Sequence, residues 1–182
     1  MALQAYQFNL KYQGYQFDDK IYGALLAASV KKGLVYKRSD TSQFKVAQNQ
    51  SELQKRALNR LFRVQKFKGN IVSFSRTEKF VAVACSDSLI RVWSLNALNQ
   101  PPRKIAGISN VKNLSFTSDE LSLLVFTSSA NKNELAVNVF PLDSNEMATA
   151  LCNQLKRNFT RDEWEIFVAA DLPYEKTCID NK

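Results

Sequence analysis

The chain has 182 residues, 45% hydrophobic and 23% charged, which is long enough for a domain with its own core. No apolar run approaches the roughly 20 residues that span a bilayer, and the first residues lack the features of a signal peptide, so the sequence predicts a cytoplasmic protein. The net charge of +8 is uneven: residues 1–70 carry 13 Lys/Arg against 4 Asp/Glu, whereas residues 143–182 carry 5 against 8, which favours an acidic partner or pairing of the two ends.

The N-terminal region is predicted to form a helical hairpin. Apolar residues recur at helical spacing over residues 2–13, and a second helix begins at Asp18 or Asp19 and ends at Gly33, with acid at its start and base at its end. The hairpin is rich in aromatic residues, which we interpret as candidate partner-binding residues: Tyr12, Tyr15, Phe17 and Tyr22.

The next segment is basic. Residues 34–36 and 44–46 are consistent with short strands around a polar turn, and residues 51–64 with a short helix. Helical spacing places Arg56, Arg60 and Arg63 on one face, with aromatic residues nearby. This pattern suggests nucleic-acid binding through residues 55–68 as an alternative function, although a basic helix face is usually only solvated.

An internal repeat begins near residue 70, where the hydrophobic period changes from 3.6 to 2. Residues 72–75 match 114–117 and residues 81–86 match 123–128 at an offset of 42, and residues 92–95 match 139–142 at an offset of 47. Alternation predicts strands over 70–75, 79–86, 89–95, 103–107, 111–117, 121–128 and 134–141.

The matched strands predict two tandem antiparallel sheets resembling propeller blades, with a generic meander as the alternative. The first core is expected to contain Val72, Phe74, Val81, Val83 and Trp93, and the second Leu114, Phe116, Leu123, Val125 and Phe140. Two blades cannot close into a ring, so we expect bare sheet faces and unpaired edges that favour self-association or another chain.

The C-terminal tail is predicted to contain a helix that starts at Thr160. Thr160 and Glu163 have the spacing of a capping box, in which each side chain accepts a hydrogen bond from the other residue's amide. Trp164 follows on an apolar face and is expected to be buried when the helix packs on the sheets.

Ser86–Leu95 resembles the end of a WD repeat, where a turn containing aspartate leads into a strand with tryptophan. Phe140 replaces that tryptophan in the second copy, and the family's Gly-His pair is absent. Residues 152–164 and 173–178 are similar to the tail of large bacterial WD-repeat signalling proteins, and residues 1–28 to the helical segment before their propeller. In those proteins the propeller is joined to a NACHT-type or related NTPase and a caspase-like or TIR effector.

The chemistry expected of an enzyme is missing. The chain has no histidine, which excludes Ser-His and Cys-His nucleophiles, and it has no phosphate-binding glycine motif. Cys85, Cys152 and Cys178 are expected to be reduced and buried, because their number is odd and the protein is predicted to be cytoplasmic. We therefore predict no cofactor, no metal and no catalysis.

Taken together, the patterns predict a mainly β protein with helical ends: a helical segment 1–68, two WD-repeat-like blades 69–143, and a helical tail 144–182 packed on the blades. The predicted function is a protein-interaction or sensor module of bacterial signalling that binds a protein partner or itself through blade edges. No membrane or small-molecule partner is expected. Trp93, Phe140, Thr160, Glu163 and Trp164 are expected to be structural.

Overall fold

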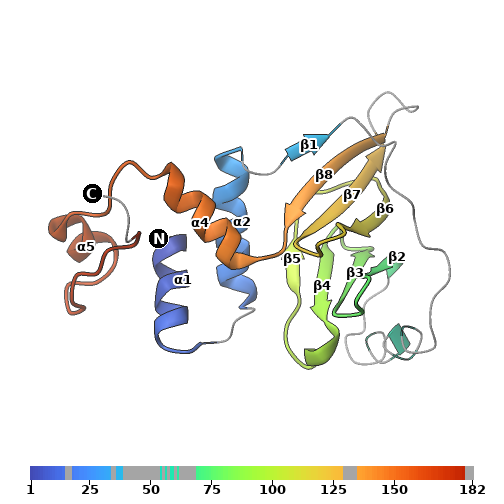
Figure 1. The fold of residues 1–182 in the computed structure, drawn as a ribbon, viewed down its shortest axis with the longest axis horizontal. Helices are drawn as coiled ribbons and strands as arrows, with labels where there is room; N and C mark the ends of the chain where they lie inside the picture. The colour runs from blue at the N-terminus through green and yellow to red at the C-terminus, as the bar shows by residue number, and fades with distance from the viewer. Residues whose placement is uncertain are drawn as a thin grey trace. The chain divides into compact units, whose positions relative to one another are not determined.

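The computed structural model describes residues 1–14, 18–33, 36–38, 54, 56, 58, 59, 61, 69–128 and 135–178 (Figure 1). The chain forms two compact units. Residues 1–34 and 143–182 make a helical unit, and residues 35–142 make a sheet unit. The C-terminal tail thus shares a unit with the N-terminal hairpin, whereas the sequence predicted the consecutive segments 1–68, 69–143 and 144–182.

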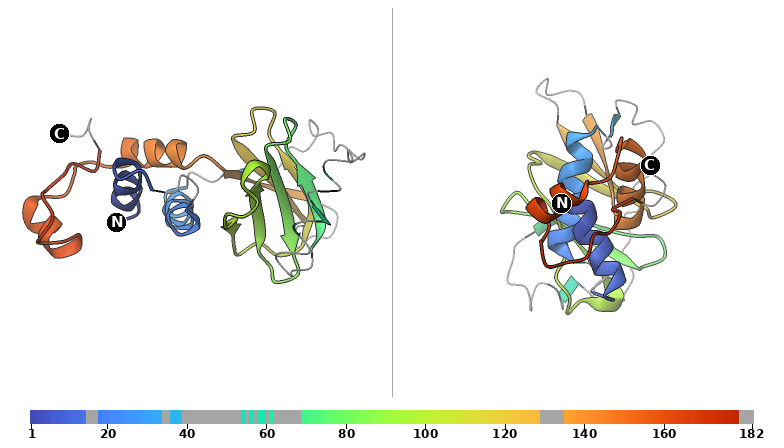
Figure 2. Two further views of the ribbon diagram at one scale, coloured as in Figure 1. Left: turned by 90° about the horizontal axis from the view of Figure 1, so that it is seen from below. Right: turned by 90° about the vertical axis from the view of Figure 1, so that its left-hand side faces the viewer.

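The helical unit contains α1 (Ala2–Lys11), α2 (Asp19–Lys31), α4 (Ser144–Gln154) and α5 (Arg161–Phe167). The first three pack together, as Figure 2 shows. Asp18 caps α2 by accepting hydrogen bonds from the amides of Lys20 and Ile21, both at 2.9 Å. Gly33 follows the helix with a φ of +72°, where glycine avoids the strain that a side chain causes. The predicted hairpin is confirmed.

The sheet unit contains two antiparallel four-stranded sheets. The first has the order β2 (Gly69–Phe74), β3 (Phe80–Cys85), β4 (Ile90–Ser94), β5 (Arg103–Ile105), and a short 3-10 helix, Leu95–Ala97, follows β4. The second has the order β1 (Tyr36–Arg38), β8 (Leu135–Pro141), β7 (Ser122–Ser128), β6 (Val111–Phe116). The predicted fold class, with two tandem sheets between helical ends, is confirmed.

Strand β1 completes the second sheet although it precedes the first sheet in the sequence. It pairs with β8, so that Tyr36 lies opposite Val139 and Arg38 opposite Val137. The sequence predicted a short strand near residues 34–36 but not its partner. The second strand predicted there, residues 44–46, lies outside the described residues.

The repeat extends to individual hydrogen bonds in the first turn of each sheet. The Ser75 hydroxyl accepts from the Phe80 amide at 3.0 Å, and the Thr117 hydroxyl accepts from the Ser122 amide at 3.0 Å. A residue with positive φ follows three positions later in each turn: Glu78 at 56° and Glu120 at 60°. The offset of 42 residues therefore relates two equivalent turns and not only two similar hydrophobic patterns.

The predicted cores are confirmed in the two sheets. In the first, Val81, Val83 and Trp93 are buried and are packed against half-buried Val72 and Phe74. In the second, Leu114, Leu123, Val125 and Phe140 are buried. Half-buried Phe116 stacks on Phe80 of the first sheet, with 6.3 Å between ring centroids, so this face of the second sheet packs on the first.

The faces that should have been bare are buried in the single chain. Leu58 and Leu61, from the segment before the first sheet, join the cluster around Trp93. On the opposite side of the second sheet, Leu124 and Phe126 are 2% and 5% exposed and pack with Val137 and Val139. The prediction of bare sheet faces is therefore wrong, since apolar side chains of both outer faces are already removed from water.

Candidate functional site

Trp164 organises the C-terminal end of the helical unit. Its side chain is 1% exposed, and its ring makes edge contacts with Phe8 of α1 and with Tyr174, at centroid distances of 5.9 and 5.5 Å. The indole nitrogen donates to the Leu172 carbonyl at 3.1 Å. The predicted capping box and burial are both confirmed, although the ring packs on α1 and the tail itself.

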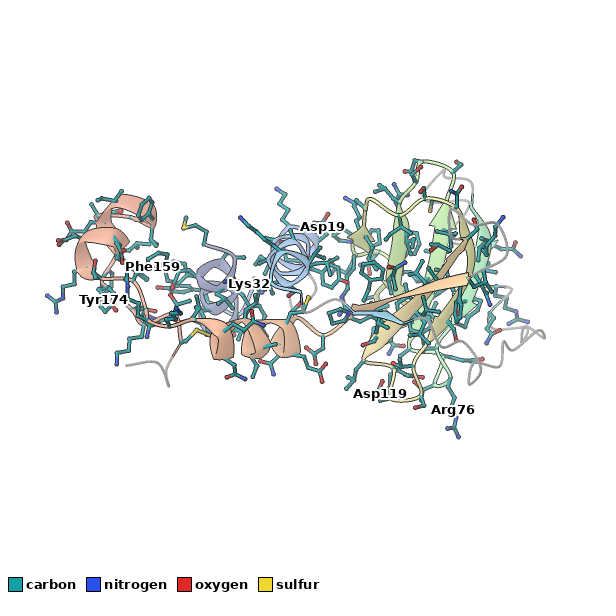
Figure 3. All side chains as sticks on the ribbon, turned by 90° about the horizontal axis from the view of Figure 1, so that it is seen from above. Asp19, Lys32, Arg76, Asp119, Phe159 and Tyr174 are labelled. Atoms are coloured by element: carbon teal, nitrogen blue, oxygen red, sulfur yellow. A yellow bond between two sulfur atoms is a disulfide. The ribbon has the colours of Figure 1, made fainter. Side chains whose placement is uncertain are left out.

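The segment after α5 is fixed by side chains from earlier in the chain. Tyr174 donates its hydroxyl proton to the Phe159 carbonyl at 2.7 Å, and the two residues lie close together beside α5 in Figure 3. Thr177 donates to the buried side-chain oxygen of Gln4 at 2.6 Å. Asn158 donates to the Cys178 carbonyl at 2.9 Å and accepts from its amide at 2.8 Å.

A disulfide joins Cys152 near the end of α4 to Cys178, with 5.7 Å between the two Cα atoms. The expectation of three reduced thiols is therefore wrong for these two residues, because folding brings positions 26 residues apart into bonding range. Cys85 is the free cysteine, and burial raises the pKa of its thiol, although the nearby Arg91 opposes that effect.

This anchored segment helps to enclose a cavity of about 600 Å³ in the helical unit. Leu3, Leu151 and Thr177 are its buried floor, and half-buried Leu155 and Phe159 form part of its wall. The exposed rim consists of Met1, Lys31, Lys32, Lys156 and Arg157. The site therefore combines an apolar floor with a basic, solvent-facing rim, and its volume is typical of ligand-binding pockets.

The rim keeps three cations available. Arg157 is paired with Glu163 through two hydrogen bonds of 2.6 and 2.7 Å, and these bonds together with the hydrogen bond from the Thr160 amide lower the pKa of Glu163 to about 2. In the described part of the chain, no ion pair engages Lys31, Lys32 or Lys156. The Arg157–Glu163 pair is therefore structural, whereas the three lysines are positioned to attract a negatively charged ligand.

Exposed apolar side chains are concentrated on the same unit. Among the described residues, seven of the nine large hydrophobic side chains that are exposed belong to the helical unit. Ile166 and Phe167 of α5 are 74% and 55% exposed. The Phe167 ring lies 6.4 Å from the ring of Phe159, so the apolar surface continues from the cavity wall onto α5.

The residues that the sequence suggested for partner binding differ in their exposure to solvent. Tyr12 is 69% exposed, whereas Tyr22 is completely buried. Arg56 is exposed and helical. The other candidates, Tyr15, Phe17, Arg60 and Arg63, lie outside the described residues.

The cavity was missed by sequence reasoning, although one signal was present. Two basic pairs, Lys31-Lys32 and Lys156-Arg157, follow or end amphipathic helices, and such pairs by themselves indicate only a helix end or surface charge.

Within the described ranges there is no group of three or more His, Cys, Asp or Glu side chains arranged to hold a metal ion. No helix there is long and apolar enough to cross a membrane.

Neither a protein-family model nor a curated protein matches the sequence. Among solved structures, the chain is similar to the crystal structure of the Myceliophteria thermophila Cps50 (Swd1) β-propeller domain, with 16% identity and a TM-score of 0.34. The match covers 43% of this chain and 23% of that domain, so this chain spans only a fraction of the propeller's length. This match gives no support to a place in bacterial signalling.

Proposed function

We propose that the protein is a non-catalytic interaction module whose helical unit binds a protein partner. The observation that carries this proposal is that exposed apolar side chains, including Ile166 and Phe167, are concentrated on the helical unit among the described residues, and that Phe167 contacts Phe159 in the cavity lining. Apolar surface of this kind, rimmed by charged residues, is typical of protein-binding surfaces.

The edges of the sheet unit are less suited to partner binding than the helical unit. Two of the four edge strands described in the sheet unit, β1 and β5, have three residues each and carry lysine and arginine, which are features that discourage pairing with another sheet, and the other two, β2 and β6, contact each other. The helical unit therefore offers more accessible apolar surface than the sheet edges do, which shifts the proposed contact from the blade edges to the helices.

A place in bacterial signalling and a cytoplasmic location stay hypotheses that rest on the sequence alone. The Cys152–Cys178 disulfide is more typical of oxidising compartments than of the cytoplasm. Nucleic-acid binding through residues 55–68 also stays a prediction, since most of that segment lies outside the described residues.

Site-directed photo-crosslinking tests the proposed function. A photoreactive phenylalanine analogue at position 167 is expected to form a covalent, nuclease-resistant adduct with one protein in the cells that express the chain. The same analogue at Leu135, which is 48% exposed in the sheet unit, is the matched control. The absence of adducts at position 167, or equal adducts at both positions, contradicts the proposal.

A further inference from the structure

The cavity has the chemistry to recognise one particular kind of segment on a protein partner. Apolar side chains line it from Leu3 and Leu151 in the floor to Leu155 and Phe159 in the wall, and three lysines lie at its rim. Resting on the proposed function above, we propose that the cavity binds an acidic peptide segment of a partner protein, with one bulky apolar side chain entering the cavity and flanking carboxylates pairing with Lys31, Lys32 and Lys156.

Charge favours carboxylates over other polar groups. Lys31 and Lys32 lie at the end of α2 and Lys156 follows α4, so cations approach the cavity from two separate elements. The C-terminal dipole of α2 opposes a bound anion, and the two lysines at that end counter it. Glu163, the carboxylate on the cavity lining, is held by Arg157 and by the Thr160 amide at 2.8 Å.

The shape of the surface favours a peptide over a single-chain amphiphile such as a fatty acid. A fatty acid has one headgroup, whereas the lysines are distributed over two elements. The apolar surface also leaves the cavity along Phe159 toward Phe167 and continues on exposed α5. An extended peptide can follow that path with successive side chains, and aromatic contacts are enriched in such interfaces.

The floor is held rigidly enough to bind without rearrangement. Thr177 is hydrogen-bonded to Gln4, Asn158 to Cys178, and the disulfide joins Cys178 to the end of α4. These bonds link α1, α4 and the C-terminal segment around the same cavity. A preformed site reduces the ordering that binding must impose.

The test measures fluorescence anisotropy of the full chain with a labelled, capped peptide that has a leucine–phenylalanine centre flanked by glutamates. Specific binding is expected to weaken at least tenfold when the glutamates become lysines, and also when the centre becomes glycine–serine. Dodecanoate is the competing amphiphile. Tight dodecanoate binding with no peptide binding overturns the proposal in favour of a lipid ligand.

Two variants connect the binding to this cavity. Lys32→Glu with Lys156→Glu is expected to reduce peptide affinity at least tenfold, while Lys20→Glu with Lys112→Glu, which makes the same change in net charge at exposed positions outside the cavity lining, is expected to change it less than threefold. Equal losses in both variants show nonspecific attraction and overturn the proposal. Phe159→Ala tests the apolar wall without changing the charge. It is expected to reduce the peptide affinity by a similar factor, and unchanged affinity contradicts binding at this site.

Failure of this proposal and failure of the proposed function are distinguishable. If the crosslink at position 167 forms but the acidic peptide does not bind, the helical unit binds a partner of different chemistry and only the present inference is wrong. If the crosslink at position 167 forms and the peptide binds with the expected variant pattern, both are supported. If neither crosslink nor peptide binding is observed, both are wrong.

Discussion

Glu120 in the second sheet's first turn accepts two hydrogen bonds from Thr77 in the first sheet's first turn, one from its amide at 2.6 Å and one from its hydroxyl at 2.5 Å. Glu120 is 9% exposed and has a φ of +60°. Its equivalent in the first turn, Glu78, accepts instead from the Gln54 side chain at 3.2 Å. Asp119, which precedes Glu120, accepts from Thr117 in its own turn. The Thr77–Glu120 hydrogen bonds therefore link the first turn of one repeat to the first turn of the other. The equivalent glutamate, Glu78, is bonded to Gln54 and takes no part in this link.

Replacing Glu120 with Gln is expected to destabilise the sheet unit by about 1–3 kcal/mol, because hydrogen bonds to a buried charged group are lost or weakened. Urea unfolding followed by tryptophan fluorescence measures the change, since Trp93 lies in this unit. Glu165→Gln, at an exposed position of α5, is the control and is expected to change stability by less than about 0.5 kcal/mol. Equal effects of the two substitutions would contradict a stabilising role for the Thr77–Glu120 hydrogen bonds.

The Thr77–Glu120 hydrogen bonds also predict that the stability of the sheet unit depends on pH. Burial raises the pKa of Glu120, but hydrogen bonds from Thr77 and Ser75 and the charge of Lys79 outweigh that effect, so the net shift is downward. A carboxyl with a lowered folded-state pKa contributes stability above its unfolded value near 4.5 and loses it as the pH falls through the folded value. The stability difference between wild type and Glu120→Gln should therefore narrow below about pH 4.5, and a constant difference contradicts this.

The elements that the sequence predicted correctly are those encoded by local patterns. Alternation located the strands around Val81 and Val125, and the spacing of Thr160 and Glu163 located a helix start. Helix α4 was missed as a separate element, although Asp143 before it and Glu146 in its first turn are ordinary start signals.

The elements that the sequence did not predict depend on contacts between distant residues. The pairing of Tyr36 with Val139 joins positions on either side of the first sheet, and no local pattern specifies it. The cavity requires α1, α2, α4 and the C-terminal segment to meet. Tyr22 is buried and not a surface aromatic, because composition alone does not distinguish the inner face of a short helix from its outer face.

Trp164→Ala is expected to cost about 3–5 kcal/mol in the helical unit, because the substitution removes a fully buried aromatic side chain and its contacts with Phe8 and Tyr174. Phe167→Ala, at a 55% exposed position on the same helix, is the matched control with an expected change below about 1 kcal/mol. Circular dichroism at 222 nm during thermal unfolding measures both. Similar melting temperatures for wild type and Trp164→Ala contradict the packing described.

The sheet unit is expected to remain monomeric in solution. Val81, Leu124 and Val137 are at most 2% exposed, so the faces that a neighbouring blade covers in a propeller are closed in this chain. Of the four edge strands described, β1 and β5 have three residues each, and β2 and β6 contact each other. Light scattering across a concentration series should give a mass near 20.7 kDa. A mass that doubles with concentration supports the alternative, self-association through the edges.

The disulfide between Cys152 and Cys178 leaves Cys85 as the free cysteine. Denaturing thiol titration of the purified, oxidised chain should detect one free thiol, Cys85. Closing a loop of 26 residues stabilises the folded state by about 3–4 kcal/mol in the chain-entropy treatment, so reduction should lower the unfolding free energy of the helical unit by that order. Three free thiols in protein purified without reductant contradict the bond.

Reduction of the disulfide should also lower the affinity of the cavity for the acidic peptide, because the bond joins the two segments that form the cavity floor. Leu151 precedes Cys152 and Thr177 precedes Cys178, and both of these neighbours form the buried floor. Cys152→Ser with Cys178→Ser should therefore bind the acidic peptide less tightly than wild type, whereas Cys85→Ser in the sheet unit should bind it equally well. If the double variant keeps both full peptide affinity and full stability, the hydrogen bonds of Asn158 and Thr177 hold the floor without the disulfide, and the bond has no part in forming the site.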